Sequence, residues 1–151
     1  MNATPALTGS RGWISTDRSA HLRGRRSRDT EPELLLRRAL HAAGVRFRLQ
    51  RRLTPGCRPD VVLPRHRVAV FVDGDFWHGC PTHGPQDFSG PNAALWRDKL
   101  ERNRQRDRQA TIRAQGLGWT VIRLWECHVR ADPAACAAAV MAGSQLVSRA
   151  R

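Results

Sequence analysis

The pattern of apolar and polar positions predicts that the folded part of the chain begins with a helix. Thr30 suits the N-cap, Pro32 is tolerated in the first turn, and Glu33 stands where a capping box has its acidic residue. Apolar residues then recur at helical spacing over 34–43, and Gly44 ends the pattern. We therefore expect one amphipathic helix ahead of the first strand.

Runs rich in β-branched residues predict four short strands after this helix. They lie at about 45–50, 60–63, 68–72 and 119–125, with a hairpin turn at 64–67, and the last run is expected to be buried. A loop at 84–91, a long helix over about 92–115 and an Ala-rich helix over about 133–148 complete the pattern. This order indicates a single α/β or α+β domain with a small central sheet flanked by helices.

The long helix carries an apolar stripe that two polar residues interrupt. Its members are spaced alternately four and three residues apart: Trp96, Leu100, Asn103, Asp107, Ala110 and Ala114. An acid on a stripe that faces the core needs a partner. Asp107 is expected to pair either with a neighbouring arginine or with a catalytic histidine that it orients.

The composition adds a strong positive charge to this picture. The chain has 26 Lys and Arg residues against 13 Asp and Glu, which gives a formal net charge of +13 at pH 7. Arginine pairs well with phosphate, and such an excess is typical of nucleic-acid-binding proteins. Neither a membrane-spanning apolar run nor a signal peptide is evident, so we expect a cytoplasmic protein that associates with the nucleoid when bound to DNA.

The first part of the chain differs from the rest. Residues 1–28 are polar, rich in Gly, Ser and Arg, and lack sustained periodicity. This is typical of a disordered tail or of a basic arm that orders on nucleic acid. We expect a flexible basic arm over 1–28 and one folded domain over 29–151.

Two acidic residues near neighbouring strand ends are candidate magnesium ligands. Asp60 heads one expected strand and Asp73 follows the next. Magnesium keeps several waters, so one or two carboxylates suffice to hold it. An ion held there can contact a scissile phosphate and activate water. Proline followed by aspartate before an apolar strand is common by chance, and taken alone Pro59-Asp60 indicates only a turn at the start of a strand.

A set of cysteines and histidines is a candidate zinc site. Cys80 and His83 have ligand spacing, and Cys127 closes an expected strand. Structural zinc takes four tetrahedral ligands from Cys, His or, less often, Asp, so Asp75 or a more distant residue would supply the fourth. The remaining cysteines are expected to be free thiols: Cys57 and Cys136.

Five blocks of sequence occur in a characteristic order: RDTEPELLLRR at 28–38, PGCRPDVV at 55–62, VFVDGDFWHGCPTH at 70–83, WRDKLERNRQRD at 96–107 and GWTVIRLWEC at 118–127. Together they resemble the very-short-patch-repair (Vsr) DNA mismatch endonuclease family, over about residues 15–130. The resemblance implies a fold similar to type II restriction endonucleases of the PD-(D/E)xK class. It also implies magnesium-dependent nicking of one strand of duplex DNA beside a T:G mismatch, and a structural zinc.

The resemblance implies a role for each matching residue of the active site. Asp60 would be the principal magnesium ligand, helped by the backbone of Val72. Glu33 would reach the water shell of the metal, unless capping of the helix is its whole role. His78 would activate water, and Asp107 would orient His78.

Three apolar or aromatic residues would contact DNA. Phe76 and Trp77 would form a wedge that enters the base stack beside the mismatch, where stacking is already weak. The alternative is that they are core residues, because neighbours on a strand face opposite ways and one at least would point inward. Leu22, in RSAHLRGR, falls where the family's N-terminal arm inserts an apolar residue into the minor groove.

Two residues depart from the family pattern. Asp73 stands where some members have a second catalytic histidine, and it would then act as a second metal carboxylate. Asp75 stands where members have a zinc-binding cysteine, which leaves Asp75, Cys80, His83 and Cys127 as the expected zinc ligands.

The expected function is magnesium-dependent nicking at or beside a T:G mismatch by a monomer, which leaves a 5′-phosphate. Repair proteins are candidate partners. Two alternatives stay open: a restriction-like or defence endonuclease on the same scaffold, and a non-catalytic, zinc-stabilised DNA-binding protein.

Overall fold

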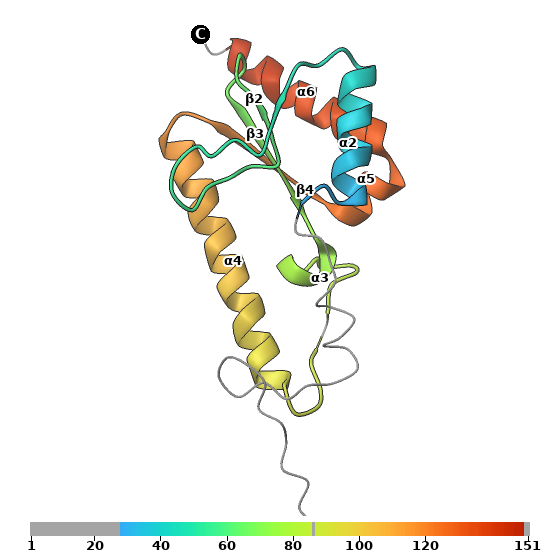
Figure 1. The fold of residues 1–151 in the computed structure, drawn as a ribbon, viewed down its shortest axis with the longest axis vertical. Coiled ribbons are helices and arrows are strands. Elements are labelled where there is room, and N and C mark those ends of the chain that lie inside the picture. The colour runs from blue at the N-terminus through green and yellow to red at the C-terminus, as the bar shows by residue number, and fades with distance from the viewer. Residues whose placement is uncertain (1–27, 86, 150–151) are drawn as a thin grey trace, which may run out of the picture.

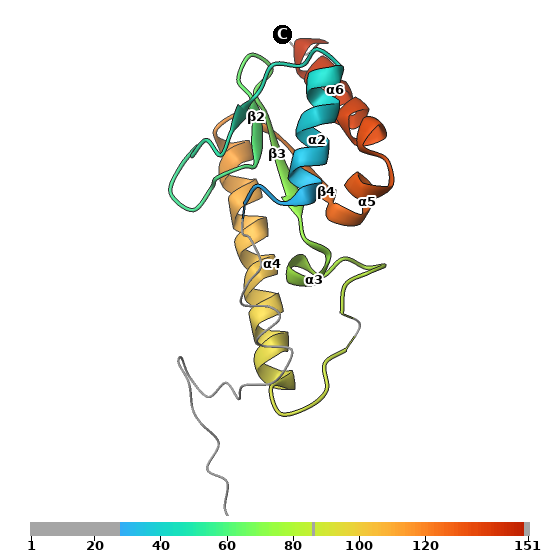
Figure 2. The same ribbon diagram turned by 45° about the vertical axis from the view of Figure 1, so that its right-hand side comes forward.

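The computed structural model describes residues 28–85 and 87–149, which form a four-stranded sheet between two layers of helices (Figures 1 and 2). The elements in chain order are α2 (Glu31–Ala42), β1 (Arg48–Leu49), β2 (Val61–Leu63), β3 (Val68–Asp73), α3 (Asp75–His78), α4 (Ala93–Gly116), β4 (Thr120–Trp125), α5 (Glu126–Ala131) and α6 (Pro133–Arg149). The predicted arm over residues 1–28 falls almost wholly outside the described residues, and Leu22 with it. Among the helices described, none is both long and apolar enough to cross a membrane.

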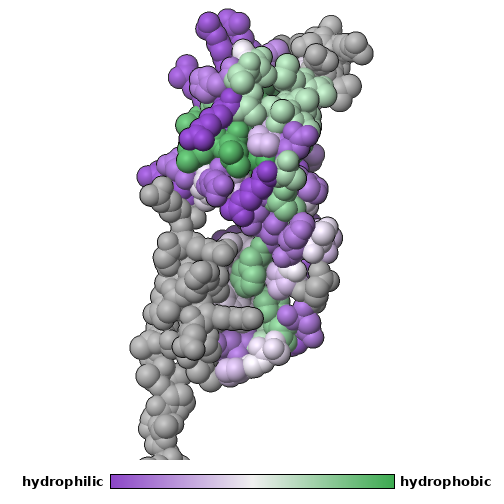
Figure 3. Space-filling model, turned by 90° about the vertical axis from the view of Figure 1, so that its right-hand side faces the viewer, coloured by the Kyte–Doolittle hydropathy of each residue, from purple (hydrophilic) through white to green (hydrophobic). Residues whose placement is uncertain are grey.

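The sheet is mixed, as expected for the α/β class. Its order is β1-β2-β3-β4, with antiparallel pairing along β1-β2-β3 and parallel pairing between β3 and β4. Helices α2, α5 and α6 cover one face, and α4 lies on the other and extends well beyond the sheet (Figure 1). The face shown in Figure 3 mixes apolar residues with strongly hydrophilic ones.

Alternation along β3 sends its side chains into two separate cores. Val68 and Val70 pack with Leu36 and Leu40 of α2 in the larger core, where all four are fully buried. Phe71 points to the other face and packs against α4, beside Ala114 in a smaller core. Because side chains alternate with a period of two, Asp73 shares the α4 face with Phe71, and this brings the carboxylate to the long helix.

Several sequence-based expectations about these elements were wrong in detail. The first strand shrinks to Arg48–Leu49, which is exposed at the sheet edge. Strand β4 is half-buried throughout, not buried, because it is the opposite edge strand and has one neighbour only. Helix α5 was missed, so Cys127 lies in a helix and does not close a strand.

The start of α2 also differs from the expected capping box. Thr30 is the N-cap, but its side chain makes no capping hydrogen bond. The carboxylate of Glu33 instead accepts the backbone N–H of Asp29 at 2.7 Å. Asp29 has a positive φ of 53°, which turns its N–H toward the helix. Glu33 thus caps the chain one residue earlier than the motif predicts.

Candidate active site

The antiparallel pairing of β2 and β3 places Asp60 and Asp73 at the same end of the sheet. The backbone N–H of Asp60 donates to Val70 O at 2.9 Å, which fixes the start of β2 against β3. Its carboxylate accepts the N–H of Val72 at 2.7 Å and the side-chain amide of Gln50 at 3.3 Å. Two neutral donors therefore orient the Asp60 carboxylate.

The Asp60 carboxylate is electrostatically disfavoured in this position. Burial and, to a smaller extent, the charges of Glu33 and Asp73 outweigh the two hydrogen bonds and raise its pKa to about 6. Glu33 is itself 4 % exposed and pairs with Arg37 at 3.3 Å. The charges of Glu33 and Asp73 thus both act on Asp60, and a divalent cation beside Asp60 would relieve this repulsion.

Helices α3 and α4 bring His78 and Asp107 together. His78 Nδ1 lies 2.5 Å from Asp107 Oδ2 and 3.7 Å from Asp73 Oδ1. Because an ionised carboxylate only accepts hydrogen bonds, Nδ1 carries the proton, and Nε2 is left as the basic nitrogen. Asn103 of the same α4 stripe donates to Trp77 O at 2.8 Å and so ties the α3 turn to α4.

The surroundings of His78 favour its charged form. Burial lowers the pKa of His78, but the hydrogen bond to Asp107 and the charges of Asp73 and Asp107 outweigh it, so the pKa is raised above the usual 6.5. The side chain is 28 % exposed. An oriented, partly accessible imidazole of this kind can accept a proton from water.

Arg123 on β4 is a site residue that the sequence reasoning missed. Its guanidinium donates to both oxygens of Asp73, at 2.8 and 3.1 Å, and to the backbone carbonyl of Asp107 at 2.9 Å. It also donates to Thr111 Oγ1 at 2.9 Å and covers the ring of Phe71 at 4.2 Å. Asp107 therefore contacts both a histidine and an arginine, the two kinds of partner that the sequence left open. A charged residue inside the run TVIRLW was the available signal, because a half-buried arginine needs acidic partners.

A second cluster has the donor set of a zinc site. The ligand atoms of Asp75, Cys80, His83 and Cys127 all lie within 4.8 Å of one another. The two sulfur atoms are 3.8 Å apart. Two sulfurs that each lie about 2.3 Å from a tetrahedral zinc ion are about 3.8 Å apart. The spacing therefore fits zinc and is far too long for a disulfide.

One member of the zinc candidate, Cys127, has a raised pKa. Burial, with hydrogen bonds to Asp75 and Cys80, raises the pKa of Cys127 to about 12. The structure brings in Asp75 as the fourth donor that the sequence left open. The other two cysteines are free thiols, as expected; Cys57 donates to Ala110 O at 3.4 Å, and Cys136 lies in the larger core.

Phe76 and Trp77 are neither strand nor core residues. They lie on the four-residue helix α3, which has no buried residue, so the strand-based argument for core packing was wrong. Their rings meet edge-to-face at 5.3 Å, and Phe76 packs at 5.5 Å on Trp96 of α4. Phe88 stacks on Trp96 at 6.2 Å and completes the group, which we call the aromatic cluster.

A cleft of about 920 Å³ opens beside some of these residues. Its lining includes Glu33, Val72, Trp77, His78 and Glu126. One opening therefore contains Glu33 from the first turn of α2, Val72 from β3, and His78 from α3.

The chain is similar to known proteins over most of its length. The family model described as DNA mismatch endonuclease Vsr matches residues 13–83. The type II nicking enzyme V.NaeI of Lentzea aerocolonigenes is 40 % identical over 117 residues, which are 75 % of this chain and 69 % of that protein. The type II nicking enzyme V.XorIIP of Xanthomonas oryzae is 42 % identical over 106 residues, 69 % of this chain and 75 % of the relative.

A further relative carries the family name itself. The DNA mismatch endonuclease Vsr of Escherichia coli is 38 % identical over 115 residues, which cover 75 % of this chain and 71 % of the relative. Identity at this level over most of both chains establishes common descent and a common restriction-endonuclease-like fold. The chain belongs to the Vsr family of DNA endonucleases.

Proposed function

We propose that this endonuclease nicks one strand of duplex DNA at or beside a T:G mismatch, in a magnesium-dependent step of very-short-patch repair. The observation that carries the proposal is the 2.5 Å contact between His78 and Asp107, since His78 and Glu33 line the same cleft. Relatives named as a mismatch endonuclease and as nicking enzymes support the reaction class. We propose that it acts as a monomer in the cytoplasm, where repair proteins are candidate partners.

The residues present fit a magnesium ion at Asp60. Burial of its carboxylate, together with the charges of Glu33 and Asp73, raises its pKa to about 6, and a bound cation would compensate the ionised form. Bound there, with the backbone of Val72 as a further candidate ligand, magnesium would polarise the scissile phosphate and acidify a water molecule. We propose that Glu33 hydrogen-bonds the water shell of the ion in addition to capping α2.

His78 is the proposed base. Asp107 holds the proton on Nδ1, so Nε2 accepts the proton of the attacking water. Asp73 lies 3.7 Å from Nδ1 and is proposed to assist, either by stabilising the imidazolium or as a second carboxylate for the metal. The leaving oxygen is the 3′ oxygen, which leaves a 5′-phosphate on the other side of the nick.

The aromatic cluster is the proposed element of mismatch detection. Phe76 and Trp77 lie in the helix that also carries His78, so insertion of their rings would place the imidazole at the neighbouring phosphate. Unstacking a base step costs a few kcal/mol, and a mismatch lowers that cost. We propose that the zinc cluster of Asp75, Cys80, His83 and Cys127 stabilises this turn from the opposite side.

Nicking of end-labelled duplexes, one fully paired and one with a T:G mismatch, tests this function. We expect nicking of the mismatched duplex with magnesium, and its loss by about a hundredfold or more in His78→Ala, as for removal of a general base. Asp60→Ala is expected to be inactive. His66→Ala, in the turn at the far end of β3, is the matched control and should leave the rate unchanged.

The other outcomes decide between the alternatives. Equal cutting of both duplexes would contradict mismatch specificity and favour a restriction-like or defence role. Binding without cleavage under any divalent cation would contradict catalysis and favour a DNA-binding protein. Loss of activity in His66→Ala as well would refute the assignment of His78 as the base.

A further inference from the structure

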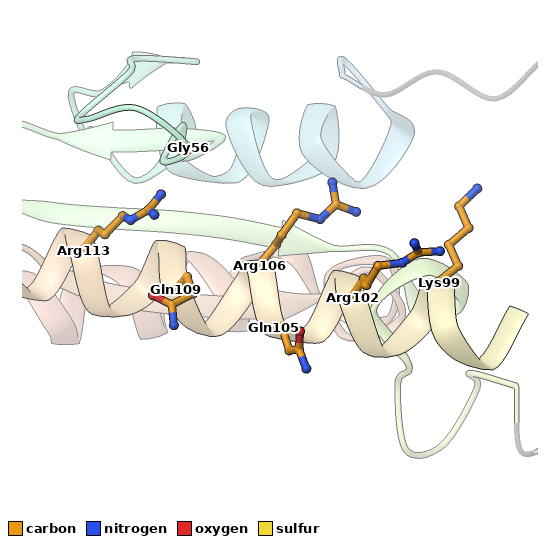
Figure 4. A pocket seen from close by; sticks show the side chains of 7 residues that line it. All are labelled: Gly56, Lys99, Arg102, Gln105, Arg106, Gln109 and Arg113. Carbon is orange, nitrogen blue, oxygen red and sulfur yellow. The ribbon is translucent and has the colours of Figure 1, made fainter. Parts of the chain in front are cut away.

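Helix α4 carries a second ordered stripe besides the one that faces the core. Its members are spaced three, four, three and four residues apart, which places them on one side of the helix: Lys99, Arg102, Arg106, Gln109 and Arg113. With Gly56 of the loop between β1 and β2 they line a hollow of about 710 Å³. We call this hollow the α4 groove. In Figure 4, Lys99, Arg106 and Arg113 project from α4 on the side that carries Gly56.

The α4 groove is cationic. Four of its described lining residues are Lys or Arg, and none of the described ones is acidic. Arg113 donates to Pro55 O at 3.0 Å and so bridges α4 to the loop that leads to Asp60. Such a concentration of one charge, on a chain of net charge +13, fits a polyanion and no apolar ligand.

A glycine forms the turn where the loop approaches the helix. Gly56 has a φ of +76°, a conformation that residues with a side chain rarely adopt. A Cβ atom there would lie 2.5 Å from Arg113 Nη1. The absence of a side chain at position 56 thus leaves Arg113 in place along the wall of the groove.

The groove is connected to the proposed mismatch detector. Lys99 Nζ lies 4.8 Å from the centre of the Trp77 ring and 5.4 Å from that of Trp96. Arg106 donates to the side-chain oxygen of Asn103, whose amide holds the carbonyl of Trp77. One end of the groove therefore meets the aromatic cluster, and the other meets the loop before Asp60.

We propose that the α4 groove receives the sugar–phosphate backbone of the DNA duplex outside the scissile step. Lys99 to Arg113 spans fourteen residues, about 21 Å at about 1.5 Å per residue. At about 3.4 Å per nucleotide along one strand, this length matches roughly six nucleotides. Arginine forks bind successive phosphates there, fix the register of the duplex and read no sequence. This proposal rests on the DNA endonuclease activity of the family and not on the mismatch or the metal.

A pair of double variants with equal changes of charge tests the groove. Arg102→Gln/Arg106→Gln removes two groove cations. Arg97→Gln/Arg108→Gln removes two cations from other sides of α4, where the side chains are 54 % and 60 % exposed. Binding to a fully paired duplex is measured by fluorescence anisotropy over a range of salt concentrations without divalent cations, so failure of the nicking proposal leaves the test intact.

The expected result is a difference in salt dependence. The slope of log K against log salt is negative, and each lost phosphate contact makes it less steep by about 0.9. The slope of the groove variant should therefore be less steep than that of the wild type by about 2. The control should lose less than half of that. Arg102→Lys/Arg106→Lys keeps the charge and should keep most of the slope, provided that thermal unfolding shows all variants folded.

Three results would overturn the proposal. Equal losses in both double variants would mean that only net charge matters. An unchanged slope in the groove variant would mean that no phosphate contacts the groove. Normal binding with impaired nicking would mean that Arg102 and Arg106 serve the catalytic site and not the backbone.

Discussion

Replacing Asp60 with asparagine is expected to stabilise the metal-free protein while it abolishes nicking. The environment raises the pKa of Asp60 from an ordinary value of 3.8 to about 6. Each pH unit corresponds to about 1.36 kcal/mol, so the ionised carboxylate costs the folded state up to about 3 kcal/mol. Asparagine has no charge to bury, and its side-chain oxygen can still accept the N–H of Val72.

The sign of this effect depends on pH. Because the folded pKa of Asp60 exceeds the unfolded one, the folded state holds more protons between about pH 4 and pH 6, and the free energy of unfolding falls as pH rises through that window. Above about pH 7 the whole penalty is present. The substitution Asp60→Asn should therefore raise the free energy of unfolding most at pH 8 and hardly at all near pH 4.

The measurement is urea unfolding of the wild type and of Asp60→Asn at several pH values, which gives the difference in their free energies of unfolding. No magnesium is added, and chelators that would strip zinc are left out. Asp87→Asn is the control, because Asp87 is exposed and hydrogen bonds from Phe88 and Arg97 lower its pKa, so the substitution should bring no gain at pH 8. A gain of Asp60→Asn that is independent of pH, or a loss at pH 8, would refute the reasoning. Added magnesium should stabilise the wild-type chain and not Asp60→Asn.

Further predictions concern the partners of the proposed catalytic and zinc residues. Asp107→Asn should lower the pKa of His78, so that the rise of the nicking rate with pH moves to lower pH while the maximal rate falls by about a hundredfold or more. An unmoved pH profile would contradict the dyad. Asp75→Cys should strengthen zinc binding in a competition with a chelator, and no change would exclude Asp75 as a ligand. Arg123→Met leaves Asp73 buried without its cation and should cost about 3–5 kcal/mol in urea unfolding, most of which Asp73→Asn in the same chain should recover; absence of recovery would mean that the pair is not the cause.

Long periodic elements were predictable from the sequence, and short ones were not. Helix α4 matches its predicted bounds within one residue at each end. Its apolar stripe repeats over several helical turns, so single polar residues in the stripe do not obscure the helical period. Helix α3 has four residues and no apolar period, and it forms because Asp75 N–H donates to Glu126 and Asn103 holds Trp77. Contacts between residues that are far apart in sequence decide such a turn, and no local pattern contains them.

The candidate site was predictable where a motif carried it. The resemblance supplied His78 and Asp107, and the structure brings their side chains into contact. Arg123 lies inside the block GWTVIRLWEC, but the resemblance assigned it no role, and its partner Asp73 lies fifty residues earlier. Only the register of β3 with β4, in which Phe71 pairs with Arg123, shows that this arginine and Asp73 lie on one face.

The two aspartates at this end of the sheet, Asp60 and Asp73, differ in their partners. Burial raises the pKa of both, but Arg123 compensates the charge of Asp73 directly, while Asp60 has only the neutral donors Val72 and Gln50. The carboxylate without a cationic partner is the one that gains most from a divalent ion. We therefore infer that Asp60 is the principal ligand, and that Asp73 serves His78 while Arg123 holds it. If Asp73 were a second ligand, binding of magnesium would have to displace Arg123, and Arg123→Met would then tighten magnesium binding; if Arg123 only holds Asp73, the same substitution leaves the magnesium affinity unchanged or weakens it.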